Sequence, residues 1–197
     1  MSKIDKKALK RESIIKAALK LFSANGFHNT TIPDIAKALN MSVGNLYNYF
    51  KSKDILAKEI IKYTSNLIGN EIRKINMQDI SSKEKIKKIV TVYFKIANTQ
   101  PEAIDYFLRV YLSHREVFND GCEGMICVTT FVTEIMIFFD DGVSKGELRD
   151  QDFFSAFGLF MGYLGGMVFL KGENILPKDL DEYIDDISIN IYNALKA

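Results

Sequence analysis

Signals that start or stop a helix follow one another closely between residues 26 and 53, and they limit this stretch to short helices. Gly26 can end a preceding helix in the left-handed conformation. Thr31, with Asp34 three residues later, has the pattern of a capping box, and Ser42 can cap a further helix. The sequence therefore predicts two helices of about eight residues joined by a tight turn, which is the spacing that a helix-turn-helix requires.

Apolar residues recur at spacings of three and four through the rest of the chain, which predicts helices throughout and an all-α fold of about nine helices. Asn40 is expected at positive φ between the two short helices. A polar turn is expected over residues 140–146. The expected helices span Lys6–Asn25, Ile32–Leu39, Val43–Phe50, Lys53–Ile75, Ser81–Asn98, Pro101–His114, Gly124–Asp141, Asp152–Leu170 and Lys178–Leu195.

The formal net charge of +1 conceals an uneven distribution. Residues 1–60 contain eleven Lys and Arg against five Asp and Glu, whereas residues 61–197 contain fifteen against twenty. A basic N-terminal region suits DNA, because lysines that displace condensed counterions supply affinity for phosphate. A basic helix face exposed to water gives the same count, so the charge alone leaves both interpretations open.

A helical wheel of residues 43–50 separates an apolar from a polar face. Centred on Leu46, the wheel predicts that Val43, Tyr49 and Phe50 are buried. Amides, a phenol and a cation suit base edges and phosphate oxygens, although an ordinary solvated face has the same composition. The polar face contains Gly44, Asn45, Tyr47, Asn48 and Lys51.

A dense pattern of fixed spacings covers residues 11 to about 56. It reads Arg11-x-x-Ile14-x-x-Ala17-Ala18-x-x-Leu21-Phe22-x-x-x-Gly26-Phe27, then Thr30-Thr31-x-x-x-Ile35-Ala36, then Met41-Ser42-x-Gly44-x-Leu46-Tyr47-x-Tyr49-Phe50-x-x-Lys53. The pattern closely resembles the DNA-binding domain of the tetracycline-repressor (TetR) family of bacterial regulators. The resemblance implies a homodimer that places two recognition helices in successive major grooves of a palindromic operator.

The resemblance also implies which residues meet double-stranded DNA. Phosphate-contacting positions of the family match Thr31, Tyr47 and Lys53, and base-approaching positions match Val43, Gly44, Asn45 and Asn48. The wheel agrees with this assignment for the last three residues but not for Val43. Asn40 stands where the family commonly has glycine, and asparagine tolerates the left-handed region that the turn needs.

The division expected from the resemblance is a DNA-binding domain over residues 1–52 and a helical effector-binding and dimerisation domain over residues 53–197. Beyond Lys62 the resemblance fades, apart from a turn with Gly142, Gly146 and Arg149. Large adaptable side chains in the middle helices suit an apolar or aromatic effector, or are simply core. The effector candidates are Tyr93, Phe94, Phe107, Tyr111, Met125 and Phe131, with Arg109, His114 and Glu134 as polar anchors.

The last two helices are expected to form the dimer interface that the family architecture implies. Three glycines at i, i+4 and i+8 allow another helix to approach closely, and an apolar stripe runs along the final helix. Packing within one chain is the alternative for that stripe. The interface candidates are Gly158, Gly162, Gly166, Ile184, Ile187 and Ile191.

Several other classes of protein are disfavoured by the sequence. Cys122 and Cys127 have neither a zinc-binding nor a Cys-x-x-Cys spacing, so no metal and no cofactor is expected. No membrane span and no secretory signal are expected, which favours a cytoplasmic protein. The expected function is a repressor released from its operator by a small effector. The alternatives are a DNA-binding regulator without an effector and a helical enzyme, although no catalytic cluster is present in the sequence.

Overall fold

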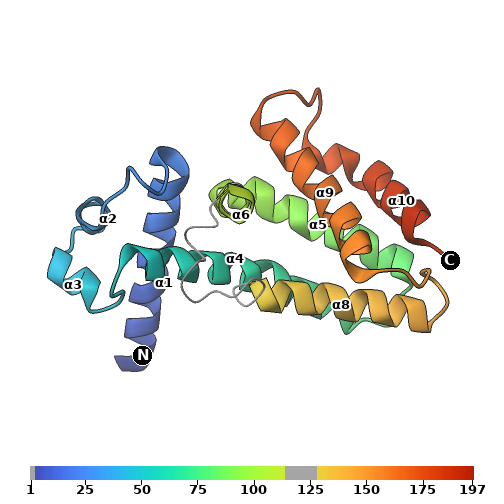
Figure 1. The fold of residues 1–197 in the computed structure, drawn as a ribbon, viewed down its shortest axis with the longest axis horizontal. Coiled ribbons are helices and arrows are strands. Elements are labelled where there is room, and N and C mark those ends of the chain that lie inside the picture. The colour runs from blue at the N-terminus through green and yellow to red at the C-terminus, as the bar shows by residue number, and fades with distance from the viewer. Residues whose placement is uncertain (1–2, 114–127) are drawn as a thin grey trace. The chain divides into compact units, whose positions relative to one another are not determined.

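The computed structural model describes residues 3–113 and 128–197, which form α-helices and one short 3-10 helix (Figure 1). The predicted all-α class is confirmed for these residues. The helices are α1 (Lys3–Asn25), α2 (Ile32–Ala38), α3 (Val43–Tyr47), α4 (Lys53–Asn76), α5 (Ser82–Thr99), α6 (Pro101–Ser113), α8 (Thr129–Ser144), α9 (Phe153–Gly172), η2 (Leu180–Tyr183) and α10 (Ile184–Leu195).

The helices form two compact units. The first contains the residues up to Thr64 together with α6 from Glu102, and the second contains Ser65–Pro101 and the chain from Val128 onward. α4 therefore supplies residues to both units. This division by packing differs from the functional boundary expected after residue 52, which stays a prediction.

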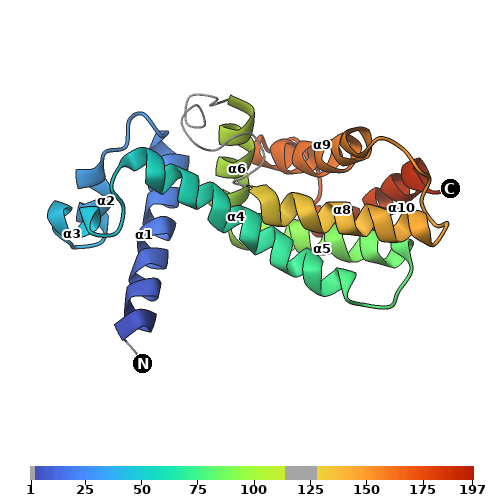
Figure 2. The same ribbon diagram turned by 60° about the horizontal axis from the view of Figure 1, so that its bottom comes forward.

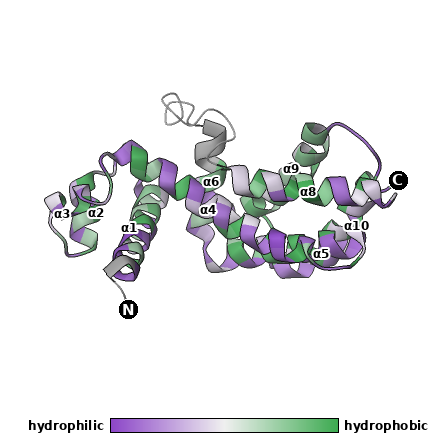
Figure 3. Cartoon of the chain, turned by 90° about the horizontal axis from the view of Figure 1, so that it is seen from below, coloured by the Kyte–Doolittle hydropathy of each residue, from purple (hydrophilic) through white to green (hydrophobic). Residues whose placement is uncertain are grey.

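The first unit packs around one face of α1. Ile14 and Ala18 are fully buried, and the same stripe continues to Phe22, whose ring stacks on that of Tyr106 in α6 at 5.8 Å. In Figure 3 the turns of α1 near its N-terminus are mainly hydrophilic, as expected for the turns before this stripe. Burial of the stripe stabilises α1 through the removal of apolar surface from water.

In the second unit α8 lies along the second half of α4, and α10 packs against α5 (Figures 1 and 2). Gly69 permits the first approach, because a Cβ there would lie 2.9 Å from the backbone of Thr130 and Phe131. Aromatic rings fill the space between α8 and α9, where Phe138 and Phe160 are 6.2 Å apart. These close contacts define a second core.

Several helix boundaries differ from those predicted, most of them by one to three residues. α3 ends at Tyr47 rather than Phe50, because the chain turns after it and buries Phe50 in the core. α8 continues to Ser144 through the expected turn, since the Asp141 side chain pairs with Lys145 one turn later, which supports a helix. The final helix opens with one turn of 3-10 helix, η2, before α10. The expected start of α8 at Gly124 lies outside the described residues.

α9 is the one helix, among the residues that the structure describes, that is long and apolar enough to cross a membrane. Its mean hydropathy over the relevant window is 1.8, and 28% of that window is buried within the chain. Length and composition are weak evidence for a membrane span, because helices that pack in soluble proteins have the same properties. The exposed apolar surface of α9 nevertheless calls for an explanation.

Candidate nucleic-acid interface

Local hydrogen bonds fix both ends of the short helix α2 and the turn that follows it. The Thr31 backbone N–H donates to Asp34 Oδ2 at 2.8 Å, and the Asp34 N–H donates to Thr31 Oγ1 at 3.3 Å. These bonds form the predicted capping box. Hydrogen bonds that the Thr31 hydroxyl and then the Thr31 backbone N–H donate to the Asp34 carboxylate hold the pKa of this exposed carboxyl below its usual range. Asn40 has a φ of 49°, as predicted for the turn. Ser42 then caps α3 by accepting a hydrogen bond from the Asn45 N–H at 3.2 Å.

Two buried side chains attach α3 to the rest of the first unit. Leu46 is fully buried, and Phe50 is 1% exposed. The wheel is wrong about Val43, which is 37% exposed, because α3 is anchored through its middle and through the residue beyond its end, so that its first residue faces outward. The predicted polar-face and DNA-contacting residues that are exposed are Thr31, Val43, Gly44, Asn45, Tyr47, Asn48 and Lys51.

Lys53 differs from the other predicted DNA contacts, because its ammonium group already binds within the chain. Nζ donates to the carbonyl oxygens of Phe27 at 2.9 Å and Thr30 at 3.1 Å, and it lies 4.3 Å from the centre of the Phe27 ring. Lys53 therefore joins the start of α4 to the chain between α1 and α2. A contact with phosphate would have to come from the same ammonium group in addition to these two bonds. This contact stays a prediction.

Arg11 is a second cation that joins helices; it opens the pattern of fixed spacings, but no role was predicted for it from the sequence. Nη1 donates to the Tyr49 carbonyl oxygen at 2.9 Å, and Nη2 forms an ion pair with Glu59 Oε2 at 2.8 Å. The sequence held a signal for it, since Arg11 lies three residues before Ile14 on the buried stripe of α1, where a charge needs a partner.

The exposed face of α3 has the chemistry needed to contact a nucleic acid. The amides of Asn45 and Asn48 can each donate and accept hydrogen bonds at a base edge, and the Tyr47 hydroxyl can donate to a phosphate oxygen. Gly44 presents bare backbone, and nothing in the described chain lies within 4 Å of a Cβ built there. The missing side chain is therefore not needed for packing within the protein.

Four of the six effector candidates are buried, and they come from three helices. Tyr93 and Phe94 are neighbours in α5, and Phe131 in α8 packs on Phe157, whereas Phe107 belongs to the first unit. Burial raises the pKa of the Tyr93 hydroxyl, which has no hydrogen-bond partner among the described residues. Tyr111 lies in α6, but its side chain is not described. Met125, His114 and both cysteines lie outside the described residues.

A pocket of about 240 Å³ opens in the second unit between the end of α8 and the start of α9. None of the effector candidates lines it. Its lining combines aromatic rings with charged side chains. The lining residues are Phe139, Asp140, Val143, Ser144, Arg149, Asp150, Gln151, Phe153 and Ala156. Within the described ranges, no three metal-ligating side chains gather.

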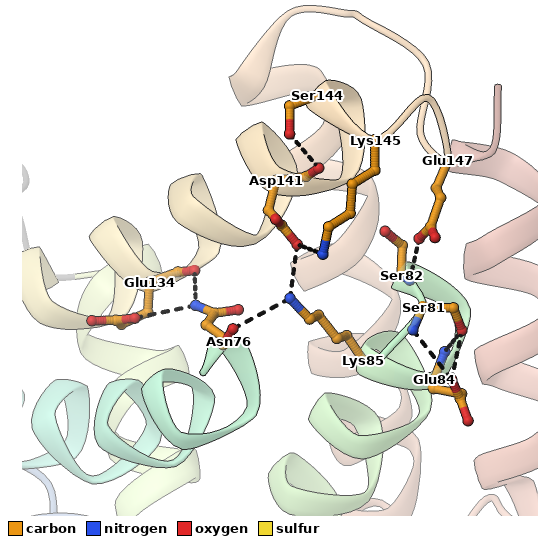
Figure 4. A network of polar contacts seen from close by, with 10 residues as sticks. All are labelled: Asn76, Ser81, Ser82, Glu84, Lys85, Glu134, Asp141, Ser144, Lys145 and Glu147. Atoms are coloured by element: carbon orange, nitrogen blue, oxygen red, sulfur yellow. Dashed lines mark hydrogen bonds and ion pairs between the residues drawn. The ribbon is translucent and has the colours of Figure 1, made fainter. Parts of the chain in front are cut away.

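A buried polar network holds the end of α4 against α5 and α8 (Figure 4). The Asn76 amide donates to the Glu134 backbone carbonyl at 2.9 Å, and Arg73 pairs with the Glu134 carboxylate at 2.7 Å. Lys85, which is 2% exposed, donates to Asp141 Oδ2 at 2.8 Å and to the Asn76 carbonyl oxygen at 3.3 Å. Glu134, a candidate polar anchor, is therefore occupied by structural contacts within this unit.

The dimer candidates divide into exposed and buried residues. Gly158, Gly162 and Gly166 are exposed on α9, and nothing in the described chain lies within 4 Å of a Cβ at any of them. Ile187 and Ile191 are buried, because α10 packs against α5, and they have almost no surface left for a partner. Ile184 is half-buried.

Comparison with known proteins adds evidence on the first unit. Residues 14–60 match the model of a family described as bacterial regulatory proteins, tetR family. These residues include α2, α3 and most of the apolar positions that hold them. Residues 14–60 therefore form a tetR-family region.

Two relatives of the chain are transcriptional regulators by name. The HTH-type transcriptional regulator YerO of Bacillus subtilis is 35% identical over 194 residues, which cover 89% of this chain and 62% of YerO. The chain thus spans about three fifths of the length of YerO. The biofilm operon icaADBC HTH-type negative transcriptional regulator IcaR of Staphylococcus aureus is 28% identical over 156 residues, which cover 77% of this chain and 80% of IcaR.

The fold is also found in solved tetR-type structures. The transcriptional regulator FadR of Bacillus subtilis, solved in complex with stearoyl-CoA, superposes with a TM-score of 0.79 at 18% identity. The alignment covers 92% of this chain and 97% of FadR. At this identity the likeness concerns the fold alone.

Replacing Gly44 with alanine tests whether this glycine is needed for packing within the protein or for contact with DNA. We expect the Gly44→Ala variant to unfold at an equal or higher temperature, since alanine in a helix is about 1 kcal/mol more favourable than glycine and the site has room. We expect operator affinity to fall about tenfold, equivalent to ~1.4 kcal/mol, because the new methyl group would keep the helix away from the base edges. Thermal melting and a fluorescence-anisotropy titration measure the two effects.

The matched control is Gly172→Ala, where nothing in the described chain lies within 4 Å of the new Cβ either. That variant should leave DNA affinity unchanged. Equal operator affinities for the Gly44→Ala variant and the unsubstituted protein would show that Gly44 does not face DNA.

Proposed function

We propose that the chain is a dimeric DNA-binding transcriptional regulator that represses genes in the cytoplasm by occupying a palindromic operator. The exposed polar face of α3, on a helix held by caps and by two buried side chains, is the observation that carries this proposal. Such a helix can enter a major groove and read base edges. The matched tetR-family region and the regulators to which the chain is similar support the same function.

Selection from a random pool of duplex oligonucleotides tests the proposal directly. The full chain should enrich a palindrome whose half-sites lie one helical turn apart, or ~34–36 Å, because a two-fold dimer presents two copies of α3. Enrichment of no sequence above a mixed-sequence duplex would contradict the proposal.

We further propose that a small apolar effector releases the operator by shifting α4, which supplies residues to both units. The FadR structure with stearoyl-CoA supports an effector with a long apolar chain. Buried aromatics of α5 and α8 offer apolar surroundings, and the unpartnered Tyr93 hydroxyl offers one polar contact. An effector acts only if it binds the two states with different affinity.

A regulator without an effector is the second candidate function. The burial of Tyr93, Phe94 and Phe131 favours it, because an effector at these residues would have to displace side chains that fill the core. Titration of the protein–operator complex with stearoyl-CoA, and with acetyl-CoA as the control that lacks the chain, distinguishes the two candidates. Release by the long-chain compound alone supports the effector. The relatives compared are regulators, and we assign the chain no enzymatic activity.

For dimerisation we propose the exposed face of α9. Phe154, Leu159 and Phe169 expose 62%, 37% and 60% of their surfaces there, beside the three exposed glycines. A second copy of the same helix would cover this apolar surface, and the missing side chains allow close approach. Ile189 of α10 is 47% exposed and extends the apolar surface, in contrast to the buried Ile187 and Ile191.

Replacing Gly162 with leucine tests this interface. The protomer should fold normally, because nothing in its described part lies within 4 Å of the new Cβ. The dimer dissociation constant should rise at least about tenfold, since a bulky side chain at a close helix contact separates the two surfaces. Sedimentation velocity over a concentration series measures it. The control Gly172→Leu should remain dimeric, and a Gly162→Leu protein that dimerises as tightly as the unsubstituted chain would place the interface elsewhere.

A further inference from the structure

We propose that Arg11, on α1, is a positioning residue for the recognition helix α3, and that it sets DNA specificity without touching DNA. This inference rests on the proposed function and adds a residue that controls the geometry of the same site. The Arg11 guanidinium binds the chain just beyond the end of α3 and fixes it to α1 and α4. Loss of these Arg11 contacts should therefore reduce the discrimination between DNA sequences.

α3 needs an external support because it has five residues. An isolated helix shorter than about 12 residues is marginal in water, so the direction of α3 depends on what holds its two ends. Ser42 and the Asn40 turn hold the first end. At the other end, the N–H groups of Tyr49 and Phe50 both donate to the Leu46 carbonyl oxygen, at 2.9 and 3.1 Å.

Arg11 supports this second end by three different contacts. Nη1 donates to the Tyr49 carbonyl oxygen at 2.9 Å, a backbone group left over after the helix ends. The guanidinium carbon lies 4.2 Å from the centre of the buried Phe50 ring. Nη2 pairs with Glu59 Oε2 of α4 at 2.8 Å. One side chain thus joins α1, the end of α3 and α4.

The chemistry of arginine is needed for all three contacts together. Its planar fork can donate in two directions while its face stacks on a ring, whereas the ammonium of lysine is a compact charge that cannot do both. The pair is partly shielded from water, with 38% of the Arg11 and 30% of the Glu59 side chain exposed. Glu59 also balances the charge of Arg11, which weakens any direct attraction to phosphate.

A direct contact between Arg11 and phosphate is the competing explanation, and Glu59→Gln separates the two. Removing a carboxylate from the DNA-binding unit should strengthen binding if charge alone matters. It should weaken operator binding if Glu59 holds Arg11 in place. The matched control is Glu12→Gln, because Glu12 pairs with Lys16 along α1.

The experiment compares the full-length chain with Arg11→Lys, Glu59→Gln and Glu12→Gln, using the operator selected by the unsubstituted protein and a mixed-sequence duplex. For Arg11→Lys we expect operator affinity to fall about tenfold. This is the loss expected if α3 is in its binding orientation in only about a tenth of the molecules, because apparent affinity scales with that fraction. Glu59→Gln should lose affinity severalfold, and Glu12→Gln should not. Affinity for the mixed-sequence duplex and the salt dependence should stay unchanged in Arg11→Lys.

Amide hydrogen exchange supplies a readout that does not depend on DNA. In Arg11→Lys and Glu59→Gln, the amides of α3 should exchange faster while those of α2 keep their rates. Loss of folding in both variants would assign Arg11 to the stability of the whole unit and overturn the positioning role.

Two further results would also overturn the inference. One is a Glu59→Gln variant that binds the operator as tightly as Glu12→Gln does. The other is an Arg11→Gln variant whose salt slope falls by about one while specific and mixed-sequence affinities fall together, as for a phosphate contact. If the unsubstituted protein selects no operator, the proposed function itself fails. If it selects one and the variants bind that operator equally well, only the inference fails.

Discussion

A protein in which Asn45 and Asn48 are both alanine is expected to lose sequence-specific DNA binding and to remain folded. Each bidentate amide contact with a base is worth about 1–3 kcal/mol, so the loss of two should lower operator affinity on the order of 100-fold. Both side chains are exposed, so their removal should not alter the core. Anisotropy titrations with the selected operator and with a mixed-sequence duplex measure the loss of specificity.

The salt dependence of binding is the informative control for this double substitution. Amides carry no charge, so the slope of affinity against salt concentration should stay the same. Asn193→Ala, which removes an exposed amide from α10, should bind the operator as tightly as the unsubstituted chain. An Asn45→Ala/Asn48→Ala protein with full operator affinity would show that the specific contacts come from other residues.

Replacement of Asp141 by alanine is expected to have the largest effect on stability. It leaves the ammonium of Lys85 buried without its carboxylate, which should lower the free energy of unfolding by about 3 kcal/mol. This value is at the lower end for a broken buried pair, because 32% of the Asp141 side chain is exposed. Urea denaturation followed by circular dichroism measures the loss.

Lys85→Met is the companion variant, because it removes the buried charge and keeps a side chain of similar length. The free energy of unfolding of the Lys85→Met variant should lie within about 1 kcal/mol of that of the unsubstituted protein, since Asp141 keeps its ion pair with Lys145. Adding it to Asp141→Ala should restore stability. A double variant no more stable than Asp141→Ala would show that the buried charge is not the cause of the loss.

The same pair makes stability depend on pH. Hydrogen bonds from Lys85 and then from Lys145 hold the pKa of the Asp141 carboxyl below its usual range. A carboxyl with a lowered pKa in the folded state contributes stability above its unfolded pKa of about 4, and loses that contribution as the pH falls through its folded pKa. The Asp141→Ala protein should therefore lose less stability than the unsubstituted protein on acidification below about pH 4.

Features set by local chemistry could be predicted from the sequence. Thr31, Asn40 and Ser42 occupy the cap and turn conformations expected of them, because each depends on residues within three or four positions. The order of the helices follows from apolar spacing in the same way. Gly26, whose φ is 82°, ends α1 as expected.

Features set by distant packing could not be predicted. The exposure of Val43 depends on which turn of α3 packs on the rest of the first unit, and a helical wheel contains no information on that packing. Arg11 and Lys53 bind carbonyl groups 38 and 26 residues away, and neither partner is visible from spacing alone. The burial of Ile187 and Ile191 likewise follows from the packing of α10 on α5.

The packing of α6 against α1 has a consequence for how the protein is made. Ser23 donates a hydrogen bond to Asp105 at 2.9 Å, and Phe22 stacks on Tyr106, so the DNA-binding unit includes residues from the middle of the chain. During synthesis on the ribosome, the first 52 residues emerge without these partners, so Phe22 has Phe27 beside it but lacks the Tyr106 ring. The unit can close only after α6 has been translated, by which time α5 of the other unit has already emerged. The other unit still lacks α8, α9 and α10 at that point, so the first unit can close before the second is complete.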